Sequence, residues 1–182
     1  MSRAAVLLID GFEETEAVTI IDVLRRAEIN VDVLGVEGKR VVGSHHIAVE
    51  ADALLADHAG DRYQLVVLPG GMPGAARLRD HDGVQAFVKA HHAAGRMVAA
   101  ICAGPIALAK AGVLQGKRAT CYPGFEGQLT GATVQKSTAV VRDGNVVTSR
   151  GPGTAMAFSL ALVEALCDAT TANMLGAAMV VG

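Results

Sequence analysis

The chain has 182 residues, of which 51% are hydrophobic and 19% charged, and its formal net charge is −2. This length and apolar content predict one domain, covering residues 1–182, that buries a sizeable core. The balanced charge argues against a nucleic-acid partner, because phosphate contacts require an excess of Lys and Arg. Aromatic residues make up only 3%, so a base-stacking surface is not expected either.

The N-terminus and the cysteines indicate a cellular compartment. The first apolar run is short and meets acidic residues at once, so it fits neither a signal peptide nor a membrane span. Cys102, Cys121 and Cys167 form no CxxC pair, and three cysteines without a leader predict free thiols in a reducing environment. We therefore expect a cytoplasmic protein that does not engage a membrane.

Apolar runs and helical periodicities alternate along the chain. In order, the patterns predict a strand over 4–9, a helix over about 15–27, a strand over 31–36, a hairpin over 40–52, a strand over 64–68, a helix over about 81–94, a strand over 97–102, a helix over 103–114, a hairpin over 138–149, a buried helix over 154–167 and a weakly helical C-terminal stretch. This alternation predicts an α/β sandwich, with a mostly parallel sheet and helices on both faces.

Ligands of such sheets bind beyond the carboxyl ends of the strands, where three loops carry suitable residues. Cys102 stands between a predicted strand and a predicted helix, the context of a nucleophile elbow. We expect the helix N-terminus to lower the pKa of this thiol and to favour the thiolate. From its position alone, Cys102 is either a nucleophile or a buried thiol that fills space.

Two other loops offer backbone donors and carboxylates. Gly70 and Gly71 follow a strand, so they form either a tight turn or an oxyanion site of exposed N–H groups. Glu13, Glu14 and Glu16 begin the first helix, where acids usually complement the helix dipole in solvent. Glu16 faces another direction, and beside a thiolate it would hold a proton and serve as an acid–base group.

The remaining polar candidates are weaker. His45 and His46 fall on a predicted strand and point to opposite faces, and His91 and His92 resemble surface residues of a helix. No histidine has a ligand-spaced partner, so we predict no metal site.

Two further segments each leave two interpretations open. Cys121 is either a second, partly exposed thiol or a small packed residue. The loop 150–154 either caps the following helix or binds an anion there.

Five segments, in this order, resemble the ThiJ/PfpI superfamily, and most closely its protein-deglycase branch, named for a Parkinson-disease protein. They are EETEAVTIIDVLRRA, VVLPGGMPGA, VAAICAGPIALA, ATCYPGFE and VTSRGPGTAMAF. The resemblance implies a flavodoxin-like three-layer sandwich, a homodimer and no cofactor. It also implies that Cys102 is the reactive cysteine, that Glu16 is a protonated carboxyl group touching its sulfur, and that Gly71 and Ala103, with Gly70 beside them, supply oxyanion donors.

The resemblance assigns further residues to the pocket and to a dimer interface. Glu13 and His45 are expected at the pocket, with His45 approaching from the partner chain, and Asp22 and Arg26 near the interface. Tyr122 stands where many members carry a histidine. A phenol is a poor base at neutral pH, which argues against a Cys–His hydrolase mechanism.

The resemblance favours an enzyme that acts on small α-oxoaldehydes. Methylglyoxal or glyoxal would become a hydroxy acid without glutathione, or the early adducts of these aldehydes with proteins would be reversed. Two alternatives stay open. Cys102 could act as an oxidative-stress sensor or support a chaperone without turnover, or the chain could be a structural α/β module, because a shared fold does not fix function.

Overall fold

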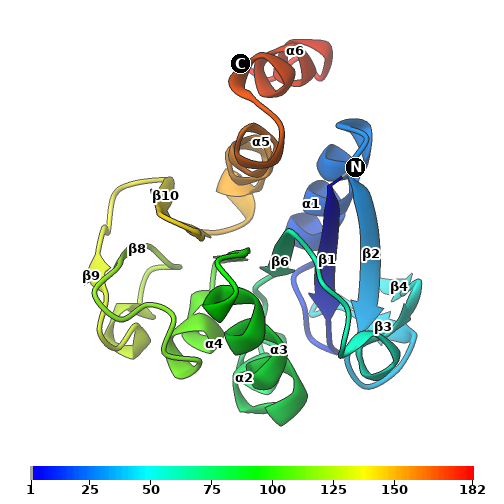
Figure 1. Ribbon diagram of the computed structural model, residues 1–182, viewed down its shortest axis with the longest axis vertical. Coiled ribbons are helices and arrows are strands. Elements are labelled where there is room, and N and C mark those ends of the chain that lie inside the picture. The colour runs from blue at the N-terminus through cyan, green and yellow to red at the C-terminus, as the bar shows by residue number, and fades with distance from the viewer. Residues whose placement is uncertain (1) are drawn as a thin grey trace.

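The computed structural model describes residues 2–182, which form one mixed α/β unit (Figure 1). The strands are β1 (Arg3–Leu8), β2 (Asn30–Gly35), β3 (Arg40–Val42), β4 (Ala48–Glu50), β5 (Ala53–Leu54), β6 (Leu65–Leu68), β7 (Met97–Ile101), β8 (Arg118–Ala119), β9 (Thr133–Val134), β10 (Val140–Asp143) and β11 (Val146–Ser149). The α-helices are α1 (Glu14–Arg26), α2 (Gly74–Asp80), α3 (Asp82–Ala93), α4 (Pro105–Lys110), α5 (Ala155–Leu166) and α6 (Ala169–Ala178). Short 3₁₀ turns cover Leu55–His58, Glu126–Gln128 and Pro152–Thr154.

Seven strands form the main sheet in the order β10-β11-β7-β6-β1-β2-β5. All neighbours are parallel except β10 and β11, which form the predicted antiparallel hairpin. β6 and β7 are buried at every residue and consist of Leu, Val, Ala, Ile and Met, as expected of central parallel strands covered on both faces. The carboxyl ends of β1, β6 and β7 therefore meet at one edge of the sheet.

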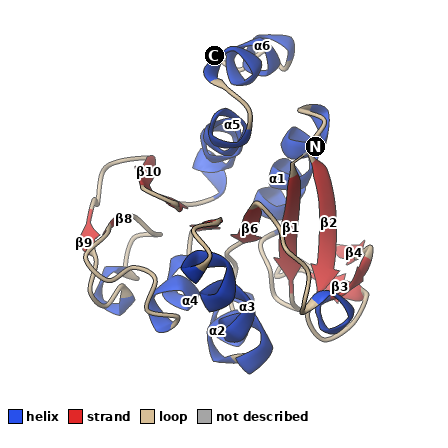
Figure 2. Cartoon of the chain, in the orientation of Figure 1, coloured by secondary structure: helices blue, strands red, loops and turns tan. Residues whose placement is uncertain are grey.

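The helices cover both faces of this sheet, which confirms the predicted sandwich (Figure 2). α1 packs against α5 and α5 against α6, while α2, α3 and α4 form a second group on the other side (Figure 1). On α1 the apolar residues Ala17, Ile20 and Leu24 face the core, whereas Val18 is 51% exposed. None of the helices in residues 2–182 is long and apolar enough to cross a membrane.

Several local predictions were wrong. α2 begins at the end of a segment expected to be a loop, and α4 ends at Lys110 instead of continuing to residue 114. β3 and β4 pair as predicted, but His45 and His46 lie in the turn between them and not on a strand. His91 was expected on the surface, yet its side chain is buried against Phe87 with a ring separation of 4.3 Å.

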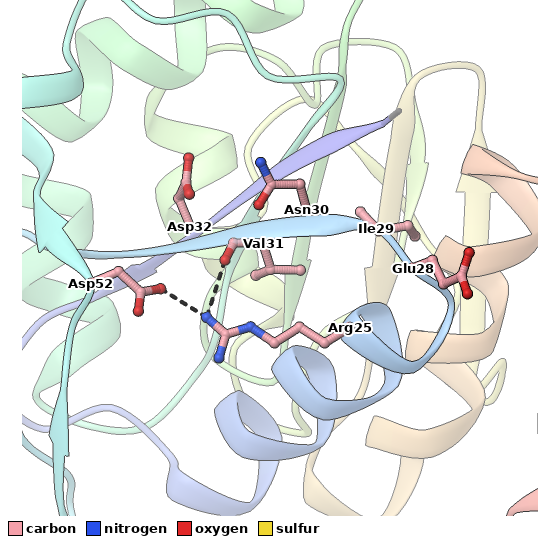
Figure 3. A pocket seen from close by; sticks show the side chains of 7 residues that line it. All are labelled: Arg25, Glu28, Ile29, Asn30, Val31, Asp32 and Asp52. Atoms are coloured by element: carbon pink, nitrogen blue, oxygen red, sulfur yellow. Dashed lines mark hydrogen bonds and ion pairs between the residues drawn. The ribbon is translucent and has the colours of Figure 1, made fainter.

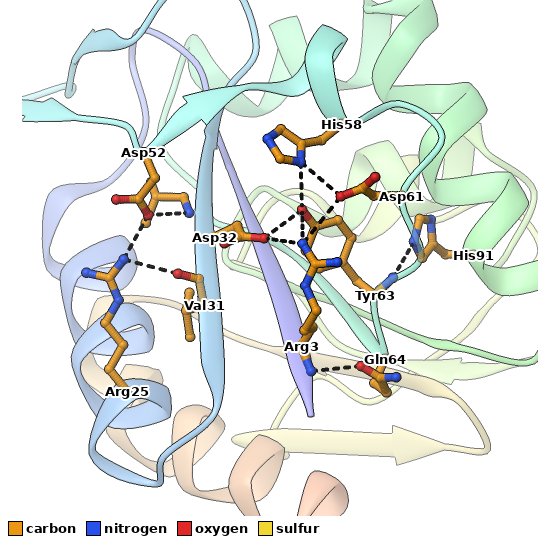
Figure 4. A network of polar contacts seen from close by, with 11 residues as sticks. Arg3, Arg25, Val31, Asp32, Asp52, His58, Asp61, Tyr63, Gln64 and His91 are labelled. Atoms are coloured by element: carbon orange, nitrogen blue, oxygen red, sulfur yellow. Dashed lines mark hydrogen bonds and ion pairs between the residues drawn. The ribbon is translucent and has the colours of Figure 1, made fainter. Parts of the chain in front are cut away.

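A polar network closes the amino end of the sheet (Figure 4). Arg3 and the Tyr63 hydroxyl both donate to Asp32 Oδ2 at 2.8 Å. Burial and the bond to Asp32 raise the pKa of Tyr63, so the phenol stays a donor. Asp61 accepts from Arg3 and contacts His58. These side chains tie β1, β2 and the segment before β6 together at the end away from Cys102.

A shallow cavity of about 720 Å³ lies beside this network, between α1 and β2 (Figure 3). Arg25 crosses it and donates to the Val31 carbonyl at 3.1 Å and to Asp52 at 2.8 Å. Asp52 in turn accepts the Val33 N–H at 2.9 Å. The polar groups that span the cavity are therefore already paired, which indicates a structural brace.

The buried His91 gives the fold an acid-sensitive contact. Its Nε2 accepts the Tyr63 N–H at 3.2 Å (Figure 4). Its Nδ1 bonds to the Phe87 carbonyl at 2.8 Å. Burial and the charges of Arg96 and Arg62 lower the pKa of His91 below 6.5. An unfolded chain therefore takes up this proton first, so the stabilisation present above pH 6.5 is lost as the pH falls toward the lower folded value.

We expect the pH dependence of unfolding to change in His91→Gln. An amide keeps one donor and one acceptor but does not titrate, so the free energy of unfolding should decline less between pH 7 and pH 5 than in the wild type. Urea unfolding at several pH values measures this difference, and His46→Gln, an exposed histidine of the turn between β3 and β4, is the control. Parallel pH profiles for wild type and His91→Gln would show that His91 is not an acid-sensitive contact.

Candidate active site

Cys102 occupies a sharp turn between β7 and α4. Its φ is +64°, a left-handed conformation that non-glycine residues rarely adopt and that costs on the order of 1–3 kcal/mol. Two backbone bonds hold the turn: Cys102 N–H donates to the Ser149 carbonyl at 3.0 Å, and the Cys102 carbonyl accepts the Tyr122 N–H at 2.8 Å. The side chain is only 9% exposed. This geometry is that of a nucleophile elbow.

Glu16 and Cys102 converge on Gly70. Glu16 is fully buried, and its Oε2 accepts the Gly70 N–H at 2.7 Å. A Cβ on Gly70 would lie 2.5 Å from Cys102 Cβ and 2.8 Å from Glu16 Oε2. Glu16 Oε1 is buried without a hydrogen-bond partner among residues 2–182. The structure therefore brings together the carboxyl group, the thiol and the glycine that the sequence singled out.

Burial raises the pKa of both acids in this pair. Burial raises the pKa of Glu16 to about 7, although the hydrogen bond from the Gly70 N–H lowers it. Burial and the charge of Glu16 raise the pKa of Cys102 to about 12, and the N–H groups of Gly71 and Ala103 oppose this shift. The predicted low thiol pKa is wrong, because α4 is only six residues long and its dipole does not offset burial beside a carboxylate.

The two acids share a single negative charge over a wide range above neutral pH. Passing one proton from Cys102 to Glu16 turns a thiol–carboxylate pair into a thiolate–carboxylic acid pair without changing its total charge. N–H groups of Gly71 and Ala103 favour negative charge on sulfur, and that of Gly70 favours it on Glu16. A nucleophilic thiolate and a protonated acid can therefore form together without a proton leaving the site.

The backbone around the sulfur is suited to bind an oxyanion. Gly71 has φ +91°, and a Cβ there would collide with the backbone of Phe12 and Glu13. Only glycine fits this close approach. Since the N–H groups of Gly71 and Ala103 both act on the sulfur, they also lie near an oxygen on a carbon bonded to it.

A second polar cluster lies on the segment just before Glu16. Glu14, expected in solvent, is buried, and its Oε2 lies 2.9 Å from His45 Nδ1. Burial alone would raise the pKa of Glu14, but hydrogen bonds from His45 and from backbone N–H groups lower it to about 2. Glu13 Oε2 is 3.5 Å from the same His45 nitrogen. The fold thus gives His45 two carboxylate neighbours that its position in the sequence did not reveal.

The segment after β8 forms another side of the site. Tyr122 is 45% exposed, and its ring meets Phe125 edge-on at 6.4 Å. Cys121 is buried, so of its two interpretations the structure supports the small packed residue. Thr154 Oγ1 accepts the N–H groups of Arg150 and Gly151 at 3.2 and 3.1 Å. The loop 150–154 is therefore a self-capped turn.

On α1, Asp22 and Arg26 form an i,i+4 ion pair at 2.7 Å, and both side chains are exposed. They lie on the outer surface, away from the buried Glu16 and Cys102. Their place at a dimer interface stays a prediction.

We expect Tyr122→Phe to lower kcat/KM for methylglyoxal by tenfold or less. The Tyr122 hydroxyl can donate one hydrogen bond to a bound substrate, so the variant should lose at most that bond, or roughly 1 kcal/mol. Steady-state kinetics of wild type and variant measure the change, with Phe125→Leu as a check on the neighbouring ring. A loss of a thousandfold would mean that Tyr122 transfers protons.

These features define a class of protein: a flavodoxin-like α/β sandwich with a cysteine on a strained turn and a buried carboxyl group beside it. The chain belongs to the DJ-1/PfpI family, whose model matches residues 2–165. It is 43% identical over 170 residues to protein dj-1beta of Drosophila melanogaster, covering 91% of this chain and 90% of that one. The crystal structure of that protein matches over the whole of both chains, with a TM-score of 0.97 and 39% identity.

Two other relatives differ from this protein in length or carry a named activity. The chain is 44% identical over 158 residues to protein DJ-1 homolog B of Arabidopsis thaliana, which covers 86% of this chain but only 36% of that longer protein. It is 34% identical over 165 residues to a protein of Pyrococcus abyssi named as a deglycase, covering 90% of this chain and 99% of that one. These likenesses establish the family, which includes deglycases.

Proposed function

We propose that this protein is a cofactor-free enzyme that converts small α-oxoaldehydes, such as methylglyoxal and glyoxal, into hydroxy acids. The observation that carries the proposal is the buried pair of Glu16 and Cys102 at Gly70. Aldehyde isomerisation needs a nucleophile to hold the substrate and a base to move a proton between neighbouring carbons. The pair supplies both within one site.

The reaction proceeds in four steps that conserve atoms and electrons. The Cys102 sulfur bonds to the aldehyde carbon, and the carbonyl oxygen takes up the thiol proton to give a hemithioacetal. Glu16 then removes the proton from that carbon to form an enediolate, whose oxyanion is held by N–H groups of Gly71 and Ala103. Glu16 returns this proton to the adjacent carbon while the hydroxyl proton of the first carbon passes to the oxygen of the second, giving a thioester. Water cleaves the thioester, which releases lactate from methylglyoxal and restores the thiol.

The same chemistry extends to the early adducts of oxoaldehydes with protein amines and thiols. The named activity of the Pyrococcus abyssi relative supports this extension. In such an adduct the carbonyl is already bound to a protein side chain, so Cys102 must displace that group before the proton transfer. The free aldehyde and the adduct therefore differ only in the first step, the formation of the bond to Cys102, and they share all later steps.

A lactate assay with purified protein and methylglyoxal tests the proposal. Wild type should form lactate, Cys102→Ser should lose nearly all of it, and Cys167→Ser should retain it, because Cys167 is exposed and remote from the pair. Lactate formation at the wild-type rate by Cys102→Ser would overturn the mechanism. The absence of lactate from wild type as well would overturn the enzyme proposal.

The donors around the sulfur also favour a second function, the sensing of oxidants. N–H groups of Gly71 and Ala103 and a protonated Glu16 can bind the oxygens of a sulfinate at Cys102. Intact-mass measurement after mild peroxide distinguishes this role. A uniform gain of two oxygens at Cys102 with no lactate formation would favour sensing over turnover.

We further infer a homodimer in the cytoplasm. All three cysteines are free thiols, which suits a reducing compartment. Val18 is half exposed on α1 and shares that helix with the Asp22–Arg26 pair. We propose that a second copy of the chain covers this surface of α1, as the resemblance to the family implies. Light scattering at micromolar concentration should give twice the chain mass, and Val18→Lys should shift the protein toward the monomer.

A further inference from the structure

Another cavity lies at the amino end of the sheet, on the face that α3 covers. It has a volume of about 240 Å³ and is lined by Ala59, Gly60, Asp61, Arg62, Ala90, His91, Ala94 and Arg96. Cys102 and the turn between β3 and β4 lie at the opposite, carboxyl end of the sheet, and α1 packs on the opposite face. The cavity is therefore separate from the candidate active site and from the surfaces that face a second copy in our dimer proposal.

Two guanidinium groups on the walls of this cavity have no carboxylate partner. Among residues 2–182, no Asp or Glu oxygen lies within 4.0 Å of a side-chain nitrogen of Arg62 or Arg96. Asp61, the acid in the lining, holds its Oδ2 at 3.3 Å from Arg3 and at 3.0 Å from His58 (Figure 4). The cavity therefore carries two positive charges that the fold leaves unbalanced.

Arg96 also supplies a donor that is buried and unused. Its Nη1 donates to the Tyr63 carbonyl at 3.1 Å, which holds the guanidinium group at the wall of the cavity. Its Nε is buried and has no acceptor within the described part of the chain. Such a donor is costly, because the hydrogen bond to water that it loses on folding is not replaced. An acceptor oxygen brought by a ligand would satisfy this group.

His91 reports the positive charge from inside the cavity. Burial lowers the pKa of His91 most, and the charges of Arg96 and Arg62 lower it further. Both ring nitrogens are already bonded, Nε2 to the Tyr63 N–H and Nδ1 to the Phe87 carbonyl. His91 therefore responds to a charge in the cavity but has no free nitrogen with which to bind a ligand.

We propose that Arg62 and Arg96 bind one phosphate group in this cavity, either as the free ion or as part of a small phosphomonoester. Guanidinium forks match the spacing of phosphate oxygens, and two of them balance the charge of a dianion. A cavity of about 240 Å³ has room for roughly eight water molecules, which is more than a phosphate ion requires. Arg62 is exposed, so the cavity opens to solvent at this residue.

Calorimetric titration of the full-length protein with inorganic phosphate, at constant ionic strength, tests the proposal. Wild type should bind one phosphate per chain, and Arg62→Gln and Arg96→Gln should each weaken binding by about tenfold or more. Two controls should stay within about twofold of the wild type: Arg118→Gln, which removes an exposed guanidinium of β8, and Cys102→Ser. Methyl phosphate distinguishes the two sources, because tighter binding than inorganic phosphate identifies an ester and weaker binding identifies the free ion.

The ring protons of His91 in nuclear magnetic resonance spectra provide a second readout. Bound phosphate neutralises the two guanidinium charges, so the pKa of His91 should rise toward its ordinary value of 6.5. Arg62→Gln should reduce this phosphate-dependent rise. Arg62 is exposed, so Arg62→Gln should keep the fold even where Arg96→Gln, which loses the bond to Tyr63, does not.

Four outcomes would overturn the proposal. No saturable uptake of phosphate by the wild type would show that Arg62 and Arg96 are solvated charges only. Uptake that is unchanged in Arg62→Gln, or a His91 pKa that does not move at saturating phosphate, would place the ion elsewhere. Equal weakening by Arg118→Gln would reduce the effect to net charge. Uptake that is lost in Cys102→Ser but kept in Arg62→Gln would assign the ion to the candidate active site.

Discussion

Lactate formation should fall at least a hundredfold in Glu16→Gln. The amide keeps the shape of Glu16 and can still accept the Gly70 N–H, but it cannot take a proton from carbon and return it. General acid–base groups contribute about 10²- to 10⁴-fold to rates, which sets the size of the loss. kcat for methylglyoxal measures it, and Glu164→Gln, an exposed glutamate of α5, provides the same substitution away from the site. A rate near that of the wild type would exclude Glu16 as the proton carrier.

The same variant should be more stable than the wild type in alkaline solution. The folded pKa of Glu16, about 7, lies above the ordinary value of 4.5. The stability that this raised pKa confers is complete below pH 4.5 and is lost as the pH rises through 7. The shift corresponds to about 3 kcal/mol. Gln does not titrate, so the difference in unfolding free energy between variant and wild type should grow by roughly this amount from pH 4.5 to pH 8.

Gly70→Ala should damage both the fold and the catalytic pair. The added methyl group would lie 2.5 Å from Cys102 Cβ, 2.8 Å from Glu16 Oε2 and 2.9 Å from the Ile101 carbonyl. Neither acid can retreat freely, because both are buried in a close-packed layer. We expect a loss of about 1–3 kcal/mol in stability from overpacking. Because a displacement of 1 Å between reacting groups can cost about a hundredfold, activity should fall by at least that factor.

Urea unfolding and the lactate assay together measure the effect of Gly70→Ala. Gly60→Ala is the matched control, since a Cβ at Gly60 meets no atom within 4 Å and its backbone is not in the left-handed region. A fully active and stable Gly70→Ala would show that Cys102 and Glu16 tolerate separation. A stable but inactive variant would separate the site's geometry from the stability of the fold.

The sequence predicted the architecture well because its signals are local. Continuous apolar runs identified β1, β6 and β7, and the helical spacing of Ala17, Ile20 and Leu24 identified the buried face of α1. Turn residues after strands then pointed to Gly70 and Cys102, since parallel strands end at a common edge. α2 was missed because its seven residues, two of them arginines, carry too few apolar positions to show a period.

The features that the sequence could not supply depend on distant neighbours. His91 is buried because Tyr63, from the segment before β6, covers it beside Phe87, which lies one turn earlier on the same helix. The Cys102 pKa depends on burial and on Glu16, which local arguments about a helix end do not include. His45 gains its carboxylates only when the turn between β3 and β4 packs against the start of α1. Each of these three features depends on a contact between residues that are far apart in the sequence.

The parallel order of β7, β6 and β1 has a consequence for the synthesis of the chain. Parallel neighbours are joined by long crossovers, so their pairing closes large loops and forms late in folding. Until then Glu16 and Cys102 are separate side chains of an unfolded chain, and no proton can pass directly between them. The pair therefore exists only in the completed molecule, and the Cys102 thiol of a nascent or misfolded chain has no buried carboxyl group beside it to exchange a proton with.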